Sequence, residues 1–387
     1  MSSDLKREYI RLLWLRYQNA NRRQKTIILN EFCQVSGLTR KYAIRRMRMV
    51  PSGFKKYPGR RRVYSEHAIF HLQKLWLLAK QVNSKKMKTI MADWLGFYAA
   101  SADVKRELLQ MSPATMDRYL KKFRVTVARR RRSGTKPGRL LKHIIPIKPF
   151  ERTIDRPGHL EADTVAHCGN RLSGDFIWTV TVTDIYSGWT ECRAIWNKGS
   201  GGVLNAIKEI EAALPFPILS FHSDNGSEFL NYAIYEYFSP EGEKKRSHPM
   251  MTRSREYRKN DNCHVEQKNW TRVRELFAYD RLDKPEQIPS MNAIYREADG
   301  LLENFFIPQM KLLSKQRIGT RYQRKYDKPQ TPYRRLLNCP NLTNEEKEQL
   351  TAQFQKLNPF RLSRELRMRL NQFFKNSKVP TEEKQAA

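Results

Sequence analysis

The sequence predicts a multidomain protein with helices at both ends and an α/β domain in the middle. Apolar residues recur at helical spacing through about the first 130 residues, short runs of β-branched and aromatic residues then alternate with helices, and a basic, mostly helical pattern follows. A chain of 387 residues is long enough for several cores. We predict domains at 1–52, 63–125, 151–290 and 300–387, with a basic linker at 126–150.

The charge balance indicates a polyanionic partner. The chain has 73 Lys and Arg against 39 Asp and Glu, and 73 − 39 gives a net charge of +34. Nucleic acid is the expected partner, because each neutralised phosphate releases counterions. An anionic membrane is disfavoured, since the sequence has neither a long apolar run nor a lipidation signal. The N-terminal residues contain no apolar segment of the kind that directs secretion.

The cysteines favour reduced thiols over a disulfide framework or a zinc finger. Their number is odd, they form no CxxC motif, and they are scattered over Cys33, Cys168, Cys192, Cys263 and Cys339. His167–Cys168 and Cys263–His264 are adjacent pairs on separate elements, which is not the ligand spacing of a structural zinc site.

A helix-turn-helix is predicted within the first 52 residues. One helix covers Lys25–Gln34, Ser36 and Gly37 make the turn, and Thr39 is placed to cap a second helix. We expect that second helix to bind DNA through its clustered cations Arg40, Lys41, Arg45, Arg46 and Arg48. The alternative is an ordinary helical hairpin with a solvated basic face.

A second block with the same character runs from about Glu66 to Phe123. Ser112 and Pro113 are typical of a helix start, and the helix that follows would present Thr115 and three cations, Arg118, Lys121 and Lys122. In the linker beyond it, a run of cations could follow a phosphate backbone or enter a minor groove, and a solvated linker is the alternative; the run is Arg129, Arg130, Arg131 and Arg132.

Between residues 151 and 290 the pattern changes to strands and helices. We predict three strands joined by tight turns, over His159–Ala166, Asp175–Thr183 and Thr190–Ile195. A helix over Val203–Leu214, a strand over Ile218–Ser223 and a helix over Glu228–Phe238 follow. The last two elements are a short strand near 250–252 and a long helix over Asn262–Tyr279. This is the element order of an RNase H-like fold.

The last region, 300–387, is basic and is predicted to be mainly helical. Thr343 begins a sequence typical of a capping box, while residues 326–337 form a proline-spaced extended segment. An apolar stripe at helical spacing predicts core packing for Leu362, Leu366, Leu370 and Phe373.

Three acidic residues stand at special places in this predicted fold. Asp163 lies in the first strand, Asp224 follows the fourth strand, and Glu266 lies in the first turns of the last helix. The first and fourth strands of such a sheet are adjacent and the helix crosses their ends, so we expect the three carboxylates to converge. Clustered carboxylates repel unless a cation neutralises them, and all-oxygen ligands favour Mg²⁺ or Mn²⁺.

The segments that carry these acids resemble a known family. HLEADTV, FHSDNGSEF and YRKNDNCHVEQKNWTRVR resemble the three catalytic blocks of the retroviral-integrase-type DDE transposases of bacterial insertion sequences, over about 155–280. The resemblance implies that Asp163, Asp224 and Glu266 bind two Mg²⁺ or Mn²⁺ ions, with Asp163 bridging both. One departure is the spacing of 41 residues between the last two acids, longer than the commonest integrase pattern, which the polar loop at 239–249 could absorb.

Other residues near these motifs have competing interpretations. Asp184 is interpreted as a turn former, Glu161 as a supporting residue on the face of Asp163, and Asp261 as a helix cap. Three more assignments are Glu228 at its own helix N-terminus, His222 as a packing residue, and Trp270 as a core residue. Two cations after Glu266 could grip DNA phosphates or could be ordinary helical surface charge; these are Lys268 and Arg272.

The leading functional hypothesis is a DNA transposase. It would cleave at the ends of its element and transfer the exposed 3′-hydroxyl into target DNA, without a covalent protein intermediate. Its partners would be terminal inverted repeats, target DNA and further copies of the chain, in a bacterial cytoplasm at the nucleoid. An RNase H-like nuclease is a second hypothesis, although exonucleases of this fold usually place Asp-x-Glu on the first strand and the order here is Glu161-x-Asp163. A DNA-binding regulator with a non-catalytic core is the third.

Overall fold

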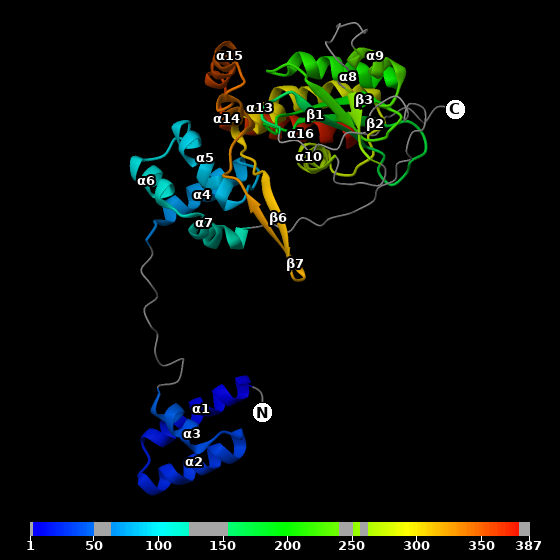
Figure 1. The fold of residues 1–387 in the computed structure, drawn as a ribbon. Helices are drawn as coiled ribbons and strands as arrows, with labels where there is room; N and C mark the ends of the chain where they lie inside the picture. Colours follow the sequence, from blue (N-terminus) through cyan, green and yellow to red (C-terminus); the bar gives the residue numbers. More distant parts are fainter. Residues whose placement is uncertain (1–2, 50–62, 124–153, 240–250, 256–261, 379–387) are drawn as a thin grey trace, which may run out of the picture. The chain divides into compact units, whose positions relative to one another are not determined.

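The computed structural model describes residues 3–49, 63–123, 154–239, 251–255 and 262–378 (Figure 1). The chain divides into two compact units, Met1–Val63 and Tyr64–Ala387. Among the described residues, no helix is both long and apolar enough to cross a lipid bilayer.

The first unit is a bundle of three helices, α1 (Ser3–Gln18), α2 (Arg22–Ser36) and α3 (Arg40–Arg48). Its small core consists of Ile10, Leu13, Ile28, Leu29, Phe32, Ala43 and Met47. The predicted helix pair is confirmed: α2 ends at Gly37, whose φ of +67° favours glycine, and α3 begins after Thr39. Thr39 has the extended backbone of an N-cap, but its side chain makes no capping hydrogen bond.

The second unit begins with four helices: α4 (Glu66–Leu78), α5 (Ser84–Gly96), α6 (Ala102–Gln110) and α7 (Pro113–Leu120), with one 3₁₀ turn, η1 (Lys121–Phe123), after them. The predicted start of α7 is confirmed, because the Ser112 side chain accepts a hydrogen bond from the backbone N–H of Thr115. These helices share one hydrophobic core with the rest of the unit: the Trp94 ring packs edge-on against Phe360, at 5.2 Å between ring centroids.

A mixed five-stranded sheet forms the middle of this unit. The strands are β1 (His159–Ala166), β2 (Ile177–Asp184), β3 (Thr190–Trp196), β4 (Ser220–Ser223) and β5 (Met251–Arg253), in the order β3-β2-β1-β4-β5. β1–β2 and β2–β3 pair antiparallel, whereas β1–β4 and β4–β5 pair parallel. The predicted strands are thus confirmed, and β1 lies in the centre with β4 beside it.

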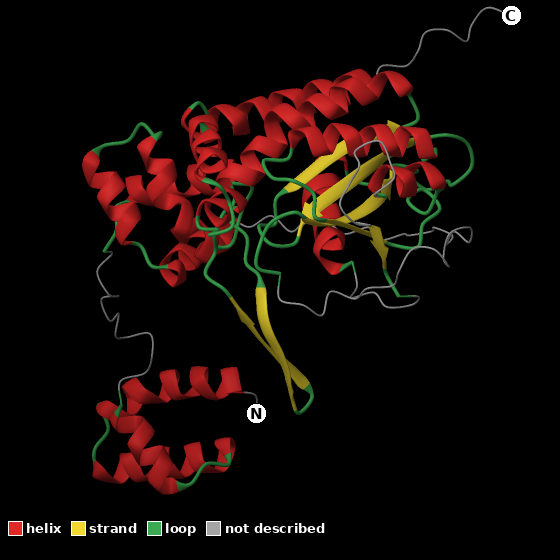
Figure 2. Cartoon of the chain, turned by 45° about the horizontal axis from the view of Figure 1, so that its top comes forward, coloured by secondary structure: helices red, strands yellow, loops and turns green. Residues whose placement is uncertain are grey.

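Helices cover both faces of the sheet (Figure 2). On one face lie α8 (Ser200–Ala213) and α9 (Tyr232–Phe238), where Phe238 stacks on Phe221 of β4 at 4.6 Å. On the other face lies one continuous helical segment, made of α10 (Cys263–Lys268), the wide π-helical turns of η2 (Asn269–Arg274) and α11 (Glu275–Phe277). Further helices follow it: η3 (Pro285–Gln287), α12 (Ile288–Ala293), η4 (Ile294–Asp299) and α13 (Gly300–Phe306).

The C-terminal region contains a β-hairpin that the sequence did not predict. Its strands are β6 (Leu312–Ile318) and β7 (Arg321–Tyr326), and the helices after them are α14 (Pro332–Leu337), α15 (Asn344–Gln355) and α16 (Pro359–Lys378). The segment expected to be extended at 326–337 instead contains α14, capped by Thr331. The predicted capping box at Thr343 is confirmed, as is the buried stripe of α16, with Leu370 partly buried.

Candidate active site

Strands β1 and β4 bring Asp163 and Asp224 to neighbouring positions, with Asp163 in the middle of β1 and Asp224 directly after β4. These strands are parallel, and Ala162 pairs with Ser223 in the ladder. Asp163 and Asp224 are each the next residue along, so both carboxylates stand at the same edge of the sheet. Because the carboxyl ends of adjacent parallel strands form a crevice in α/β sheets, this edge is a natural place for a ligand.

The ionised form of Asp163 is unfavourable in its surroundings. One oxygen accepts a hydrogen bond from the backbone N–H of Thr164 at 2.8 Å, and the other accepts one from the Asn269 side chain at 2.6 Å. Burial and the neighbouring charge of Asp224 nevertheless raise the pKa of Asp163 to about 7, with a smaller contribution from Glu266. The charges of the other two acids therefore both act on Asp163.

Asp224 lies in a tight turn after β4. Its carboxylate accepts a hydrogen bond from the backbone N–H of Gly226 at 2.9 Å. A Cβ at position 226 would stand 2.7 Å from the Glu228 carboxyl group and 2.9 Å from Asp224 Oδ1, so a larger residue there would displace these two carboxyl groups. Burial raises the pKa of Asp224, and the charge of Glu228 adds to that effect.

The helix that carries Glu266 is docked directly onto β1. The Asn262 side chain donates a hydrogen bond to the backbone carbonyl of Ala162 at 3.0 Å, and the Asn269 side chain donates one to the Asp163 carboxylate. These two asparagines flank Glu266 in the helix and attach the helix to β1. The Glu266 side chain itself is exposed. Within the described ranges, no group of three His, Cys, Asp or Glu side chains that could hold a metal ion is found, so the expected convergence of all three carboxylates is not confirmed.

Glu161 serves as the cap of this helix. Its carboxylate accepts hydrogen bonds from the backbone N–H groups of His264 at 2.8 Å and Val265 at 3.0 Å. Its side chain points to the same face of the sheet as Asp163, as strand alternation predicts. Burial raises the pKa of Glu161 to about 8 in spite of the two N–H donors. The sequence assigned Glu161 only a general supporting role, and the cap is the specific one.

The structure settles several competing interpretations. Asp184 is the turn former expected, because its carboxylate accepts hydrogen bonds from Gly158 and from both the backbone and the hydroxyl group of Ser187. The expectation for Glu228 was wrong: α9 begins only at Tyr232, after the Asn231 cap, and Glu228 instead accepts a hydrogen bond from Thr164.

Three further interpretations have different outcomes. His222 is buried between Thr252 and Ser254, at 2.9 Å and 3.1 Å from their hydroxyl groups. Trp270, expected in the core, is 36% exposed and donates a hydrogen bond to Glu275. Asp261 lies outside the described residues.

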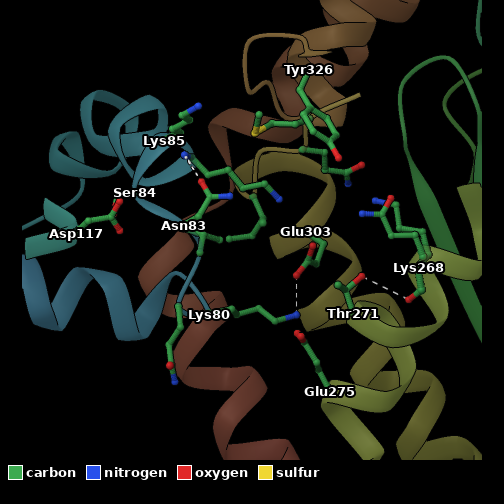
Figure 3. Close-up of a pocket in the computed structure, with 17 residues that line it drawn as sticks. Lys80, Asn83, Ser84, Lys85, Asp117, Lys268, Thr271, Glu275, Glu303 and Tyr326 are labelled. Atoms are coloured by element: carbon green, nitrogen blue, oxygen red, sulfur yellow. Dashed lines mark hydrogen bonds and ion pairs between the residues drawn. The ribbon is translucent and has the colours of Figure 1, made fainter. Parts of the chain in front are cut away.

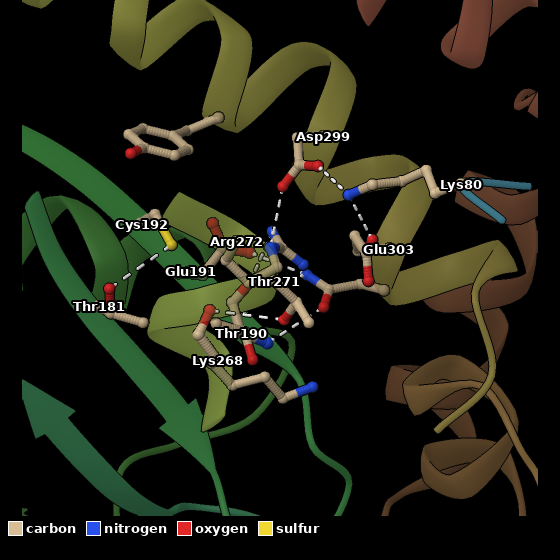
Figure 4. Close-up of polar contacts among 12 residues, drawn as sticks. Lys80, Thr181, Thr190, Glu191, Cys192, Lys268, Thr271, Arg272, Asp299 and Glu303 are labelled. Carbon is tan, nitrogen blue, oxygen red and sulfur yellow. Dashed lines mark hydrogen bonds and ion pairs between the residues drawn. The ribbon is translucent and has the colours of Figure 1, made fainter. Parts of the chain in front are cut away.

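Arg272 does not reach the surface, which corrects its assignment as a DNA contact. It is fully buried and its Nε lies 2.9 Å from Asp299 Oδ2 (Figure 4). Lys80, from the loop between α4 and α5, pairs with Asp299 at 3.0 Å and with Glu303 at 2.6 Å. The π-helical turns of η2 direct the Arg272 side chain inward, and the sequence alone carried no sign of this because the partner acids lie some thirty residues further along the chain.

Lys268 lines a cavity of about 680 Å³ (Figure 3). Other residues around this cavity include Lys85, Lys86, Thr271 and Tyr326. Burial, with smaller contributions from the positive charges of Arg272 and Lys86, lowers the pKa of Lys268 to about 7, although the charge of Glu303 opposes this shift. Lys268 therefore stays a candidate for phosphate contact, through this cavity.

The residues predicted to contact DNA from helices differ in their solvent exposure. On α3, Arg40, Lys41, Arg45 and Arg48 are exposed and Arg46 is half-buried. On α7 and η1, Arg118 and Lys121 are exposed, whereas Thr115 is buried and cannot be presented to DNA. The side chain of Lys122 and the whole run Arg129, Arg130, Arg131 and Arg132 lie outside the described residues.

The donor set at the sheet edge fits a divalent cation. The charge of Lys198 lowers the pKa of Asp224, but Lys198 pairs with Glu228 at 3.5 Å, and the pKa values of Asp163 and Asp224 are nevertheless both raised. Two adjacent carboxylates with raised pKa values are oxygen ligands of the kind that Mg²⁺ and Mn²⁺ prefer.

Comparison with known proteins places the chain among relatives without giving it an activity. It is 35% identical over 345 residues to the uncharacterized protein y4rM of Sinorhizobium fredii (strain NBRC 101917 / NGR234), an alignment that covers 86% of this chain and 95% of that protein. The chain belongs to the y4rM family. No model of a known protein family matches the sequence. Since y4rM is itself described as uncharacterized, the function has to be inferred from the site.

Proposed function

We propose that the protein is a DNA transposase of the DDE type, with Asp163, Asp224 and Glu266 as its catalytic acids. The observation that carries the proposal is the position of Asp163, in the middle of β1, next to Asp224, which directly follows the parallel strand β4; the charge of Asp224 helps to raise the pKa of Asp163. The sheet order β3-β2-β1-β4-β5, with its first three strands antiparallel and the rest parallel, supports an RNase H-like core. The helix docked across β1 then carries the third acid.

The three acids would hold two Mg²⁺ or Mn²⁺ ions. A bound pair of such ions activates an attacking oxygen and stabilises the leaving one in phosphodiester displacement. The chain's own residues prepare this site. Asn269 fixes the Asp163 carboxylate, Glu161 holds the start of α10, and Gly226 lets the turn after β4 close tightly.

The charge distribution supports DNA as the substrate. The chain carries a net charge of +34, and α3 of the first unit exposes four cations on one short helix. We infer that α3 contacts the terminal repeats of the element. Since two element ends must be joined to one target, we further propose that the protein acts as a homo-oligomer on DNA, at the nucleoid of a bacterial cytoplasm.

The test uses the full chain and duplexes that carry the two ends of the DNA flanking its gene. With Mg²⁺ or Mn²⁺, we expect nicks that expose a 3′-hydroxyl and joining of that end to a second duplex. Asp163→Asn should reduce both steps by more than about 100-fold, the upper range for residues that only support a metal ligand. Asp175→Asn, at an exposed position just before β2, is the matched control and should leave both steps unchanged.

The outcomes separate the alternatives. Cleavage without joining would favour an RNase H-like nuclease. Binding to the end duplexes with neither cleavage nor joining would favour a regulator. Cleavage and joining that persist in Asp163→Asn would show that the acids at the sheet edge are not the catalytic site.

A further inference from the structure

The β6–β7 hairpin projects from the second unit without a hydrophobic face of its own (Figures 1 and 2). All seven residues of β6 and all six residues of β7 are exposed, so both faces of the ribbon meet solvent. Gly319, with a φ of +60°, makes the turn between the strands. An isolated two-stranded ribbon is only marginally stable in water, which indicates that this hairpin gains stability from a partner.

The base of the hairpin is firmly attached, so its direction is set by the fold. Lys311 and Asp327 close the base with two hydrogen bonds, from Lys311 N to Asp327 Oδ1 at 2.7 Å and from Asp327 N to Lys311 O at 3.0 Å. Asp327 also pairs with Arg335 of α14 at 2.7 Å. The Lys311 ammonium group donates to the carbonyl of Tyr186, in the turn between β2 and β3. The hairpin is therefore anchored both to α14 and to the sheet.

The charge of the hairpin has one sign. Between Leu312 and Tyr326 there is no acidic residue, and the cations are Lys315, Arg317, Arg321, Arg324 and Lys325. In the ladder, Lys315 lies directly opposite Arg324, and Arg317 lies opposite Tyr322. Strand alternation puts these four residues on one face, and the Lys315 ammonium group lies 4.7 Å from the centre of the Tyr322 ring.

This face is unfavourable unless a polyanion covers it. Like charges at directly opposite cross-strand positions destabilise a ribbon, and Lys315 and Arg324 form such a pair. The hairpin also exposes apolar side chains, which a second copy of the chain could cover; Leu313 and Ile318 are examples. Ile318 lies on the other face of the ribbon, opposite Arg321 and on the same side as Lys325, so apposing either face to its copy in a second hairpin would bring two sets of cations together. A phosphate backbone removes the repulsion that a second copy would increase.

We propose that the β6–β7 hairpin is a DNA-binding arm, which lies in a groove of duplex DNA with Lys315, Arg317 and Arg324 against the phosphates. The major groove admits a two-stranded ribbon, so the shape of the hairpin agrees with its charge. The proposal rests on the proposed function only for the identity of the polyanion.

The test measures the affinity of the full chain for a generic duplex across a salt series, without divalent cations. The triple variant Lys315→Gln, Arg317→Gln, Arg324→Gln removes the three charges from exposed positions and leaves the core untouched. We expect affinity at 0.1 M salt to fall roughly tenfold or more, and the salt slope to shrink by about 2–3, or about 0.9 for each phosphate that is no longer neutralised. The matched control is Arg361→Gln, Arg364→Gln, Arg367→Gln on the exposed side of α16, which removes the same charge.

Each outcome decides the proposal. An equal loss of affinity in both triple variants would show a general charge effect and overturn it. A hairpin variant with unchanged affinity but an altered oligomeric state in size-exclusion chromatography with light scattering would show that the hairpin clasps a second copy. If the hairpin variant alone loses duplex binding and the original chain neither cleaves nor joins the end duplexes, the DNA-binding arm is supported and the transposase proposal fails. If the original chain cleaves and joins the end duplexes and the hairpin variant keeps its duplex binding, the transposase proposal is supported and the arm is contradicted.

Discussion

Two groups of carboxylates lie beside the helical segment 263–277: one group is buried and paired with protein cations, and the other is half-buried with raised pKa values. Asp299 and Glu303 are neutralised by the protein's own cations, Arg272 and Lys80, and the charge of Lys80 helps to hold the pKa of Glu303 well below its usual range despite burial. Asp163 and Asp224 are half-buried and both of their pKa values are raised, while the nearby cation Lys198 pairs with Glu228 at 3.5 Å.

The difference separates a structural cluster from a functional one. The charges of the buried acids Asp299 and Glu303 are neutralised within the protein. Through Lys80, these ion pairs also fix the loop between α4 and α5 to the core. Adjacent half-buried acids with raised pKa values cost stability when both are ionised, and such an arrangement is typical of functional sites. The comparison supports the proposal that a divalent cation neutralises Asp163 and Asp224.

The first way to test the comparison is to break the complete cluster. Arg272→Met keeps the length of the apolar stem but leaves Asp299 with only Lys80. Loss of one partner of a buried ion pair leaves an uncompensated charge, so we expect the free energy of unfolding to fall by about 3–5 kcal/mol, measured by urea denaturation. Arg364→Met on the exposed surface of α16 is the control and should change it by less than about 0.5 kcal/mol. An Arg272→Met protein as stable as the original would remove the structural role of this cluster.

The second test uses the pH dependence of stability without metal. The pKa of Asp163 in the folded protein is about 7, above its ordinary value, so the folded state holds this proton more tightly than the unfolded state. The contribution of Asp163 is therefore most favourable at low pH, and is lost as the pH rises from about 4 to about 7.

We expect Asp163→Asn to be more stable than the original chain at pH 8, by on the order of 2 kcal/mol once solvent screening of this partly exposed edge is allowed for. At pH 4, where the original carboxyl group is protonated, the difference should nearly vanish. Denaturation curves at both pH values check this. A difference independent of pH would mean that the charge of Asp163 is not destabilising.

The smallest effect is expected at the helix cap. Glu161→Ala removes the acceptor for two N–H groups at the start of α10, and such caps contribute about 1 kcal/mol. Hydrogen exchange should show faster exchange of the His264 and Val265 amides in this variant. Glu161→Gln retains an acceptor oxygen and should exchange more slowly than Glu161→Ala; equal rates in both variants would argue against the cap.

Much of the fold followed from local sequence patterns. The β-branched and aromatic residues of the first strands, the helical face of α8 and the cap at Thr343 are local signals, and each predicted its element correctly. The β6–β7 hairpin was missed because none of its residues is buried, so the strand positions carry no alternation between apolar and polar side chains. The start of α9 was missed because the tight turn after Asp224 takes up the residues before Asn231.

The candidate site was predictable as a set of residues but not as a set of contacts. Strand order and register were enough to place Asp163 beside Asp224. The cap by Glu161 and the grip of Asn269 on Asp163 join residues about a hundred positions apart, which a single sequence does not reveal. Arg272 was misassigned for the same reason, since its partner Asp299 becomes visible only once η2 and η4 are packed together.

The most direct test of the unneutralised acids is Mn²⁺ binding by titration calorimetry at pH 8, with and without duplex DNA. We predict that the original chain and Asp175→Asn bind Mn²⁺ equally, and that Asp163→Asn loses at least about tenfold in affinity. Equal binding by all three proteins, or no binding by the original chain even with DNA present, would contradict the proposal that Asp163 and Asp224 bind a divalent cation.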